Sequence, residues 1–571
     1  MLLFTAWLLS YRIQVSFAPD TLSPHCRMSQ APPSSGTAVA TETPPTSIPG
    51  ILSRLGPGLI IAGSIVGSGE LIATTKTGAE AGFWLLWLII VGCVIKVFVQ
   101  VELGRDAIVR GKTTMDALTE VPGPAIKGRG NWLLWYYFLM FAVSLGQLGG
   151  IVGGVGQAMA ISMPLTQHGR EFNEYLRVKT QKAVADKELQ NAANATRSPE
   201  ELTKLRQRAE ELQERLDAFG KDYENRQKRF WSDDRIWALL FAIATSLLLV
   251  VGRYGLIEAV TTALVAMFTM VTVANVFMLQ TTADWGINAS DIINGLRFQL
   301  PPPSEPGHAT ALATALKTFG IIGVGANELL AYPYFCIEKG YARFTGPRDE
   351  SKAWGERARG WMNVMRWDAW CSMVVYTVAT IAFYLLGAAV LGRTGLIPSD
   401  SDLMRTLNVM YEPVFGAWAE ILFLVGAFAV LYSTYFVANA GHARVLTDAL
   451  QAVNVIPRNE RIRKGSVTIL SGTLPFICLG VYYAAYFSST SISQLVLVSG
   501  MMQALMLPMI AAAALYFRYQ RSDARLRPGL AWDIFLWLSS LGMLVAAGCL
   551  LYGEVNKTLS KKPVTPVVKT P

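Results

Sequence analysis

Apolar residues in this chain are gathered into blocks of about 20 residues, separated by charged loops. A helix needs about 20 apolar residues to cross the ~30 Å hydrocarbon core of a bilayer. Lipid offers no partner for backbone N–H and C=O groups, so a spanning segment is a helix or part of a closed barrel. Barrel strands are shorter and alternate in polarity. We therefore predict an all-α integral membrane protein with about 11 transmembrane helices.

The charge content agrees with this prediction. Only 16% of the residues are charged, against roughly 25% in soluble proteins. This deficit argues against a soluble enzyme. We expect the transmembrane segments at residues 57–75, 84–103, 132–160, 236–252, 256–279, 310–333, 370–391, 414–439, 466–487, 493–517 and 530–552.

Basic residues are concentrated in the loops after the second, sixth, eighth and tenth segments, among them Arg110, Arg357, Arg463 and Arg521. Basic loops stay on the cytoplasmic side of a membrane. We therefore expect a multi-pass protein of the plasma (inner) membrane with a cytoplasmic N-terminus, although the basic C-terminal tail departs from the pattern. The net charge of +9 is explained by this topology and does not indicate nucleic acid. Lipid is the expected surrounding.

The cysteines are scattered, and the sequence has no CxxC pair and no His/Cys cluster. A zinc or iron–sulfur site is therefore not expected, and we predict no resident cofactor.

Both ends of the chain lack the apolar blocks. Residues 1–50 begin with a short apolar stretch and continue into a region rich in Pro, Ser and Thr, which predicts disorder. The first stretch is either a signal sequence or a segment preceding a true start at Met28. Residues 553–571 are predicted to form a disordered C-terminal tail.

A polar insert at 165–232 separates segments 1–3 (51–164) from segments 4–11 (233–552). Its second half begins Ser198-Pro199-Glu200-Glu201, a capping box with proline at the first helical position. Apolar residues then recur at spacings of three and four, which favours a helical hairpin. The hairpin is either a solvated spacer or the binding site of a protein partner.

Two apolar segments contain glycine clusters that end in a carboxylate. The first segment carries Gly63, Gly67 and Gly69 before Glu70, and the sixth carries glycines at 320, 323 and 325 before Glu328. Glycines alone often serve close helix packing, and a lone intramembrane glutamate can be a structural partner. Interrupted helices five segments apart are, however, typical of inverted-repeat transporters, whose unwound backbone binds ions. We therefore predict broken first and sixth segments around a central site.

The sequence resembles the NRAMP family of divalent-metal transporters. The resemblance rests on Gly56-Pro57-Gly58, the run from Gly78 to Phe83, Arg366-Trp367-Asp368, and the spacing of Ser499 and Pro508. It covers about 55–552 apart from the insert. It implies an inverted-repeat fold of the amino-acid/sodium symporter type, with ten core helices and one extra.

The substrate positions depart from this family. Its Asp-Pro-Gly-Asn motif in the first segment corresponds to Gly67-Ser68-Gly69-Glu70, and its Met-Pro-His motif corresponds to Asn327-Glu328-Leu329. Its tenth-segment glutamine corresponds to Gly500, with Gln503 one turn later, and a third-segment aspartate linked to proton movement corresponds to Gln147. The resemblance therefore does not carry over the family's soft thioether ligand or its proton coupling.

The residues present still offer hard oxygen donors. We predict metal ligands at Glu70, Asn327 and Glu328, within an ion site formed by Val66, Gly67, Glu70, Gly325, Asn327, Glu328 and Gln503. Carboxylate, amide and backbone oxygens suit Mg²⁺ or Mn²⁺ better than softer metals. Lys96 is expected to extend toward the inner surface, with a pairing to Glu70 as the alternative.

Three functions remain open at this point. The first is transport of a divalent cation, and the second is transport of an organic solute or a monovalent ion by the same fold. The third is a membrane receptor or scaffold that acts through the insert and transports nothing.

Overall fold

The computed structural model describes residues 41–560 apart from 59–65, 195–197, 221–222, 224–230, 252–254, 283–284, 302–310 and 399–402. Every regular element among the described residues is a helix. The start at Met28 and the rest of the N-terminal expectations before residue 41 lie outside the described residues, as do residues 561–571.

Nine helices in the described part of the chain are long and apolar enough to cross a membrane. They comprise α5–α6 (Leu86–Val94 and Lys96–Arg110), α8 (Trp132–Ser162), α12 (Asp233–Val251), α13 (Gly255–Met278), α18 (Lys352–Leu386), α21 (Ala419–Ala452), α22 (Glu460–Phe487), α23 (Ile492–Tyr516) and α24 (Leu530–Ser560). The predicted first and sixth segments are not among the nine. The sixth is divided into two short helices, and residues 59–65 of the first lie outside the described residues.

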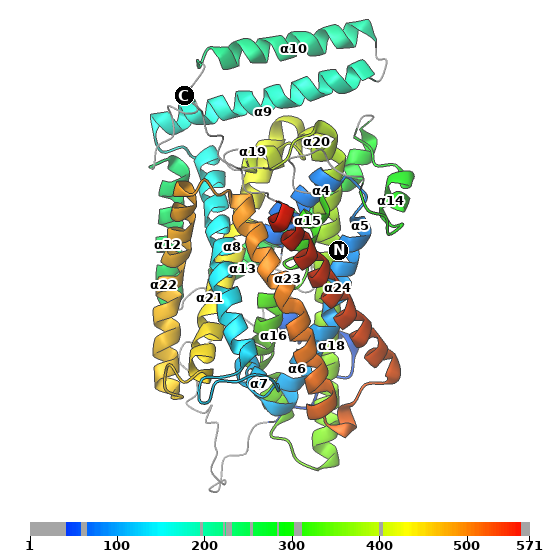
Figure 1. Cartoon of the computed structure of the whole chain (residues 1–571), viewed down its shortest axis with the longest axis vertical. Coiled ribbons are helices and arrows are strands. Elements are labelled where there is room, and N and C mark those ends of the chain that lie inside the picture. The colour runs from blue at the N-terminus through cyan, green and yellow to red at the C-terminus, as the bar shows by residue number, and fades with distance from the viewer. Residues whose placement is uncertain are drawn as a thin grey trace, which may run out of the picture.

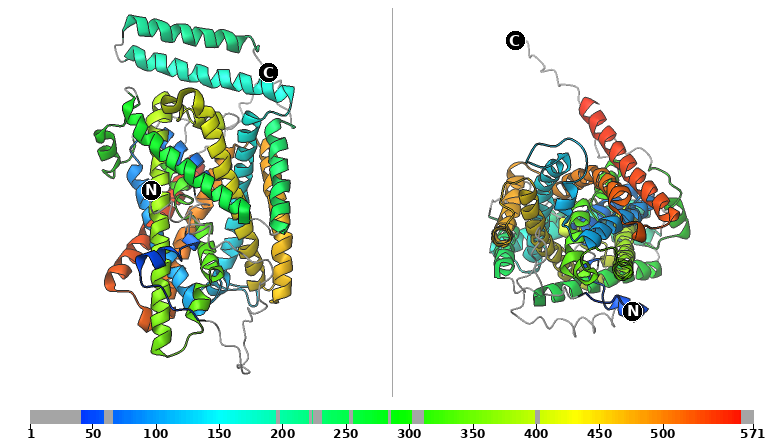
Figure 2. Two further views of the ribbon diagram at one scale, coloured as in Figure 1. Left: turned by 180° about the vertical axis from the view of Figure 1, so that it is seen from behind. Right: turned by 90° about the horizontal axis from the view of Figure 1, so that it is seen from below.

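The long helix α8 lies at the centre of one half of the bundle. It packs against α12, α21, α22 and α23. Glycines on α8 allow this close approach: a Cβ at Gly149 would lie 3.0 Å from the carbonyl oxygen of Cys478, and one at Gly156 would lie 2.1 Å from that of Asp234. Small residues at helix contacts are the usual means by which membrane helices pack. Viewed from behind, α13 crosses its neighbours obliquely (Figure 2).

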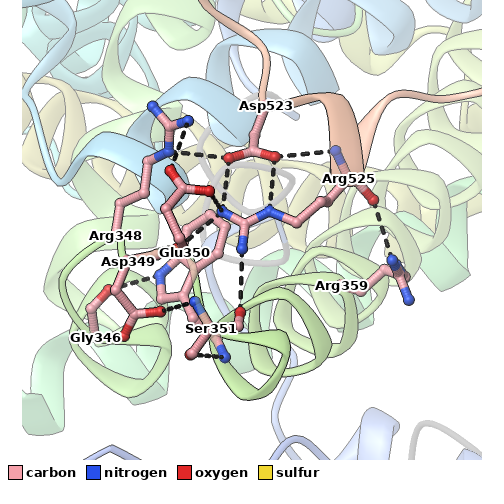
Figure 3. A network of polar contacts seen from close by, with 9 residues as sticks. Gly346, Arg348, Asp349, Glu350, Ser351, Arg359, Asp523 and Arg525 are labelled. Atoms are coloured by element: carbon pink, nitrogen blue, oxygen red, sulfur yellow. Dashed lines mark hydrogen bonds and ion pairs between the residues drawn. The ribbon is translucent and has the colours of Figure 1, made fainter.

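The loops that carry the basic residues share one end of the bundle, near α7 (Thr114–Leu118) and the start of α18 (Figure 1). We call this the basic end. Figure 3 shows part of it, where Asp523 accepts hydrogen bonds from Arg348 and Arg525 at 2.9 to 3.0 Å. Arg525 also donates to the carbonyl oxygens of Asp349 and Ser351. The hydrogen bonds from Arg525 hold the pKa of Asp523 well below its usual range.

The insert lies across the opposite end as two helices, α9 (Gln167–Asn194) and α10 (Pro199–Asp217) (Figure 1). A small apolar cluster joins them, formed by Val178, Ala185, Ala209 and Leu212. Ser198 caps α10 by accepting a hydrogen bond from the N–H of Glu201. α9 also contacts α19 (Leu403–Asn408), which lies between α18 and α21.

The described parts of the two tails contain more structure than the predicted disorder. Residues 41–47 run along the basic end, where Glu42 N–H donates to the carbonyl oxygen of Phe344 and Trp361 Nε1 donates to that of Glu42. A short helix, α2 (Ile48–Leu52), follows. At the other terminus α24 continues to Ser560, past the predicted boundary at 552. Backbone partners from other segments explain the N-terminal difference, since a composition-based prediction does not include them.

Candidate ion site between the first and sixth segments

The sixth segment is broken in its middle. α15 (Ala311–Phe319) ends before Gly320, and α16 (Ala326–Glu338) begins after Gly325. Gly323 has φ +57°, a conformation that side chains with a Cβ rarely adopt. Gly320 lies so close to α23 that a Cβ there would meet the carbonyl oxygen of Gly500 at 2.0 Å. The glycines therefore permit both the turn and the close packing, as the sequence predicts.

The first segment is irregular at the corresponding place. Val66 and Gly67 form a turn, and a π-helix, η1 (Gly69–Thr74), follows before α4 (Thr75–Ala81). The two breaks face each other, since a Cβ at Gly69 would lie 2.9 Å from the carbonyl oxygen of Ile321. The predicted interruption of both segments is thus confirmed among the described residues.

Glu70 lies between the two breaks and is fully buried. Its Oε1 accepts hydrogen bonds from the Gly323 N–H at 3.2 Å and from Thr380 Oγ1 at 3.4 Å. Its Oε2 accepts one from the Gly67 N–H at 3.4 Å. All three donors are neutral groups, and all three bonds are long. The carboxylate is therefore held in place by groups that a cation can replace without breaking an ion pair.

A second set of oxygens lies at the start of α16. Gln503 Oε1 accepts a hydrogen bond from the Asn327 N–H at 3.4 Å. A Cβ at Gly325 would lie 2.4 Å from Glu328 Oε2 and 2.9 Å from Gln503 Oε1, so both oxygens border the space above this glycine. The side-chain amide of Asn327 donates instead to Ser144 Oγ at 3.0 Å.

The predicted site residues therefore form two neighbouring groups. Glu70 lies with Val66 and Gly67 at the first break, and Gly325, Asn327, Glu328 and Gln503 lie at the second. Among the residues that the structure describes, no three His, Cys, Asp or Glu side chains are gathered closely enough to hold a metal ion. Any metal ligand set in this arrangement must include amide, backbone or water oxygens.

Gln147 of α8 joins the two groups, although it is not among the predicted site residues. Its Nε2 donates to Ser68 Oγ at 3.0 Å. Its Oε1 accepts from Gln503 Nε2 at 2.7 Å and from Ser499 Oγ at 3.3 Å. By taking the amide N–H of Gln503, Gln147 turns the oxygen of Gln503 toward α16. In the sequence Gln147 is one of the few polar residues of a mostly apolar third segment, together with Ser144 and Gln157.

The expectation for Lys96 was wrong. Lys96 is fully buried, and its ammonium donates to the carbonyl oxygens of Phe319 at 2.6 Å and Ile322 at 2.7 Å. The last carbonyls of a helix have no partner within the helix, and they carry partial negative charge. The C-terminal end of α15 thus binds the side chain that was expected to extend toward the surface.

The start of the first segment is capped from α18. Asp368 accepts hydrogen bonds from the N–H groups of Gly56 at 2.8 Å and Gly58 at 2.5 Å, and from the Tyr332 hydroxyl at 3.2 Å. Unpaired N–H groups at a helix start attract a carboxylate. Asp368 therefore connects two of the sequences on which the family resemblance rests.

Comparison with solved structures supports the fold. Two crystal structures of a manganese transporter from Eremococcus coleocola, one of a mutant and one in complex with an aromatic bis-isothiourea substituted compound, superpose with a TM-score of 0.54. Each match covers 92% of this chain and 92% of the other, at 14% and 16% sequence identity. The inverted-repeat fold of the amino-acid/sodium symporter type is thereby confirmed.

Comparison with curated protein sequences gives no match. The family model described as natural resistance-associated macrophage protein-like matches residues 230–553, which is more than half of the 571 residues. That stretch includes the sixth-segment break, α18 and α23. The chain therefore belongs to the Nramp family of secondary transporters.

Proposed function

We propose that this transporter carries a divalent cation of the hard class, Mg²⁺ or Mn²⁺, between the two breaks, with Glu70 as its principal ligand. The observation that carries the proposal is the full burial of Glu70 between two unwound segments, in contact with neutral donors alone. A buried carboxylate in a membrane is costly unless it is paired or liganded. A cation at this place offsets that cost.

The donors near Glu70 support a hard cation. Glu328 and Gln503 offer oxygens at Gly325, and the unwound backbone adds carbonyl oxygens near Val66 and Gly325. Oxygen donors suit Mg²⁺ and Mn²⁺, whereas thiolate and thioether donors favour softer metals. Because only two carboxylates contribute, we expect the bound ion to keep part of its water shell.

The same geometry suggests how binding is linked to movement. Glu70 contacts the sixth segment through Gly323 and α18 through Thr380, at 3.2 and 3.4 Å. A cation that draws the carboxylate away releases both contacts at once. In this fold one repeat rocks against the other around a fixed site, and broken helices line that site. Glu70 is thus placed to link ion binding to the packing of the two repeats.

A stability screen of the purified full-length protein tests the proposal. A ligand that binds only the native state raises the unfolding temperature. We expect Mg²⁺ and Mn²⁺ to raise it saturably in the wild type and not in Glu70→Gln. Glu120→Gln, a carboxylate change at the basic end, is the matched control and should respond like the wild type. No response of the wild type to any divalent cation would overturn the proposal.

A second candidate is transport of an organic solute or a monovalent ion. It is favoured by the missing cluster of three ionisable ligands in the described part of the chain, and by the amides of Gln147, Asn327 and Gln503 at the breaks. The same screen separates the two, since this candidate predicts stabilisation by a solute or monovalent ion and none by divalent cations. Deleting 165–232 tests the scaffold hypothesis, which requires the insert.

We also propose that the basic end faces the cytoplasm and the insert faces outward. The basic loops share one end of the bundle and α9–α10 lies at the other (Figure 1). Single cysteines at the exposed positions Glu200 and Glu356 test this orientation in intact cells, in a background without native cysteines. A membrane-impermeant thiol reagent should label the first and not the second; the reverse pattern would overturn the orientation.

A further inference from the structure

The ammonium of Lys96 is in direct contact with neutral, electron-rich groups. The carbonyl oxygens of Phe319 and Ile322 lie 2.6 and 2.7 Å from Nζ, and the ring centroid of Phe319 lies 4.9 Å away. The two carbonyls belong to the C-terminal end of α15 and to the break that follows. Half-helix C-termini and unwound carbonyls are the groups that bind coupling cations in transporters with broken helices. Here a side chain of the protein itself supplies the cation.

One peptide unit joins this ammonium to the central carboxylate. The carbonyl oxygen of Ile322 accepts from Lys96, and the N–H of the same peptide, on Gly323, donates to Glu70 Oε1 at 3.2 Å. Charges of opposite sign at the two ends of a peptide polarise it in the same direction and strengthen both bonds. Gly323 needs its positive φ to present the N–H in this way, and a Cβ there would lie 3.0 Å from the ring of Tyr376.

We propose that Lys96 is a built-in monovalent cation that fills a small cation site at the end of α15. Through the Ile322–Gly323 peptide it also positions Glu70. The site belongs to the class that binds ammonium, Na⁺ or K⁺, and its permanent occupation by Lys96 makes the fold independent of such ions. The role of Lys96 in positioning Glu70 rests on the function proposed above. The role of Lys96 in filling the cation site is independent of that function.

Removing the ammonium separates the two roles. Lys96→Ala leaves the two carbonyls without their cation and opens space in which a small free cation can bind. Lys96→Met fills the same space with an uncharged chain and leaves no room for an ion. Lys76→Ala is the control, because Lys76 is also mostly buried but its Nζ donates to the hydroxyl of Ser493, away from the break.

The test measures thermal unfolding of the full-length variants in N-methylglucamine chloride, with NH₄⁺, Na⁺ or K⁺ exchanged in at constant ionic strength. We expect Lys96→Ala to unfold several degrees below the wild type and to recover saturably with at least one small cation. Lys96→Met should also unfold at a low temperature, and added cations should not raise it. The unfolding temperatures of the wild type and Lys76→Ala should not change with the cation. A Lys96→Ala protein as stable as the wild type, or one without any cation response, would overturn the proposal.

Divalent affinity tests the second role. Loss of a residue that orients a ligand typically lowers metal affinity 10–100-fold, so we expect about a tenfold loss in Lys96→Ala that ammonium reverses. If the wild type binds no divalent cation, the proposed function fails. The effect of monovalent cations on the unfolding temperature of Lys96→Ala still tests whether a cation site exists at the end of α15. If Lys96→Ala does not fold, the double variant with Lys96→Met and Glu70→Gln decides. Recovery of folding when both charges are removed supports the link between Lys96 and Glu70 through the Ile322–Gly323 peptide. Continued failure to fold overturns it.

Discussion

Glu70 and Glu120 carry the same carboxylate in opposite surroundings. Glu120, in the loop after α7, accepts hydrogen bonds from Arg110 at 2.7 and 2.9 Å and from Lys112 at 2.5 Å. It also pairs with Arg521 at the end of the tenth segment, at 3.3 Å. Glu70 accepts hydrogen bonds from two backbone N–H groups and one hydroxyl.

The difference shows which carboxylate is available to an ion. Three cations already neutralise Glu120, and they join the loop after the second segment to the end of the tenth segment at the basic end. Partial burial is the largest single influence on the pKa of Glu120 and acts to raise it. The hydrogen bonds and the positive charges of Arg110 and Lys112 together outweigh it and lower the pKa from 4.5 to about 2. Glu70 has neutral partners and lies between two unwound segments. We infer that Glu120 maintains the structure and that Glu70 binds the substrate.

The largest effect expected from this comparison is on divalent affinity. Changing a residue that only orients a ligand costs 10–100-fold, so loss of the ligand in Glu70→Gln should weaken Mn²⁺ binding by more than about 100-fold. Glu120→Gln should stay within about twofold, because its charge is already compensated. Isothermal titration calorimetry of the two variants checks both values. Equal losses in the two variants would remove the distinction drawn between the carboxylates.

A methyl group at the second break should have the next largest effect. Gly325→Ala places a Cβ 2.4 Å from Glu328 Oε2 and 2.9 Å from Gln503 Oε1, so these oxygens must move. We expect about a tenfold loss of affinity, equivalent to about 1.4 kcal/mol. Gly480→Ala is the control, because no atom lies within 4 Å of its added Cβ. An unchanged affinity in Gly325→Ala would place the ion at Glu70 alone.

Gln147 should contribute less to divalent affinity, because it acts through other residues. Gln147→Leu removes the closer acceptor of Gln503 Nε2 and leaves it only the longer bond to Ser499 Oγ at 3.3 Å, so that the amide is held less firmly. One hydrogen bond is worth about 0.5–1.5 kcal/mol, so we expect a threefold to tenfold loss of affinity with the fold retained. Gln280→Leu, at the end of the fifth segment, should bind like the wild type. A loss as large as that of Glu70→Gln would make Gln147 itself a ligand.

The smallest effect concerns the pH dependence of stability at the basic end. The folded pKa of Glu120 lies below its ordinary value, so its contribution is present above pH 4.5 and is lost as the pH falls toward 2. We expect the free energy of unfolding of the wild type to exceed that of Glu120→Gln by about 1 kcal/mol at pH 6 and by less at pH 3. Chemical unfolding at the two values measures the difference. A difference in the free energy of unfolding that increases as the pH falls would contradict the assignment of Glu120 to ion pairs.

Sequence patterns predicted the parts of this molecule that depend on local signals. Blocks of apolar residues indicated the segments, and glycines followed by a carboxylate indicated the breaks at Gly67 and Gly325. These features need no knowledge of distant contacts, because an apolar run must be helical in lipid and a glycine cluster weakens a helix wherever it occurs.

The partners of the buried polar groups could not be predicted in the same way. Lys96 is more than 220 residues from the carbonyls that it binds, and Gln147 is more than 350 residues from Gln503. Their contacts depend on the packing of whole helices, which the local pattern does not contain. For the same reason the sequence grouped Glu70 with Glu328 without assigning neighbours to either; in the structure Glu70 lies at the first break and Glu328 at the second.

Uptake into proteoliposomes shows directly whether ions pass through the site at Glu70. Wild type, Glu70→Gln and Glu120→Gln should be reconstituted at equal density, and the entry of Mn²⁺ and Mg²⁺ followed with a fluorescent indicator inside the vesicles. We expect saturable uptake of at least one of these ions by the wild type and Glu120→Gln, and none by Glu70→Gln. Uptake by Glu70→Gln at the wild-type rate, or none by the wild type, would contradict this expectation.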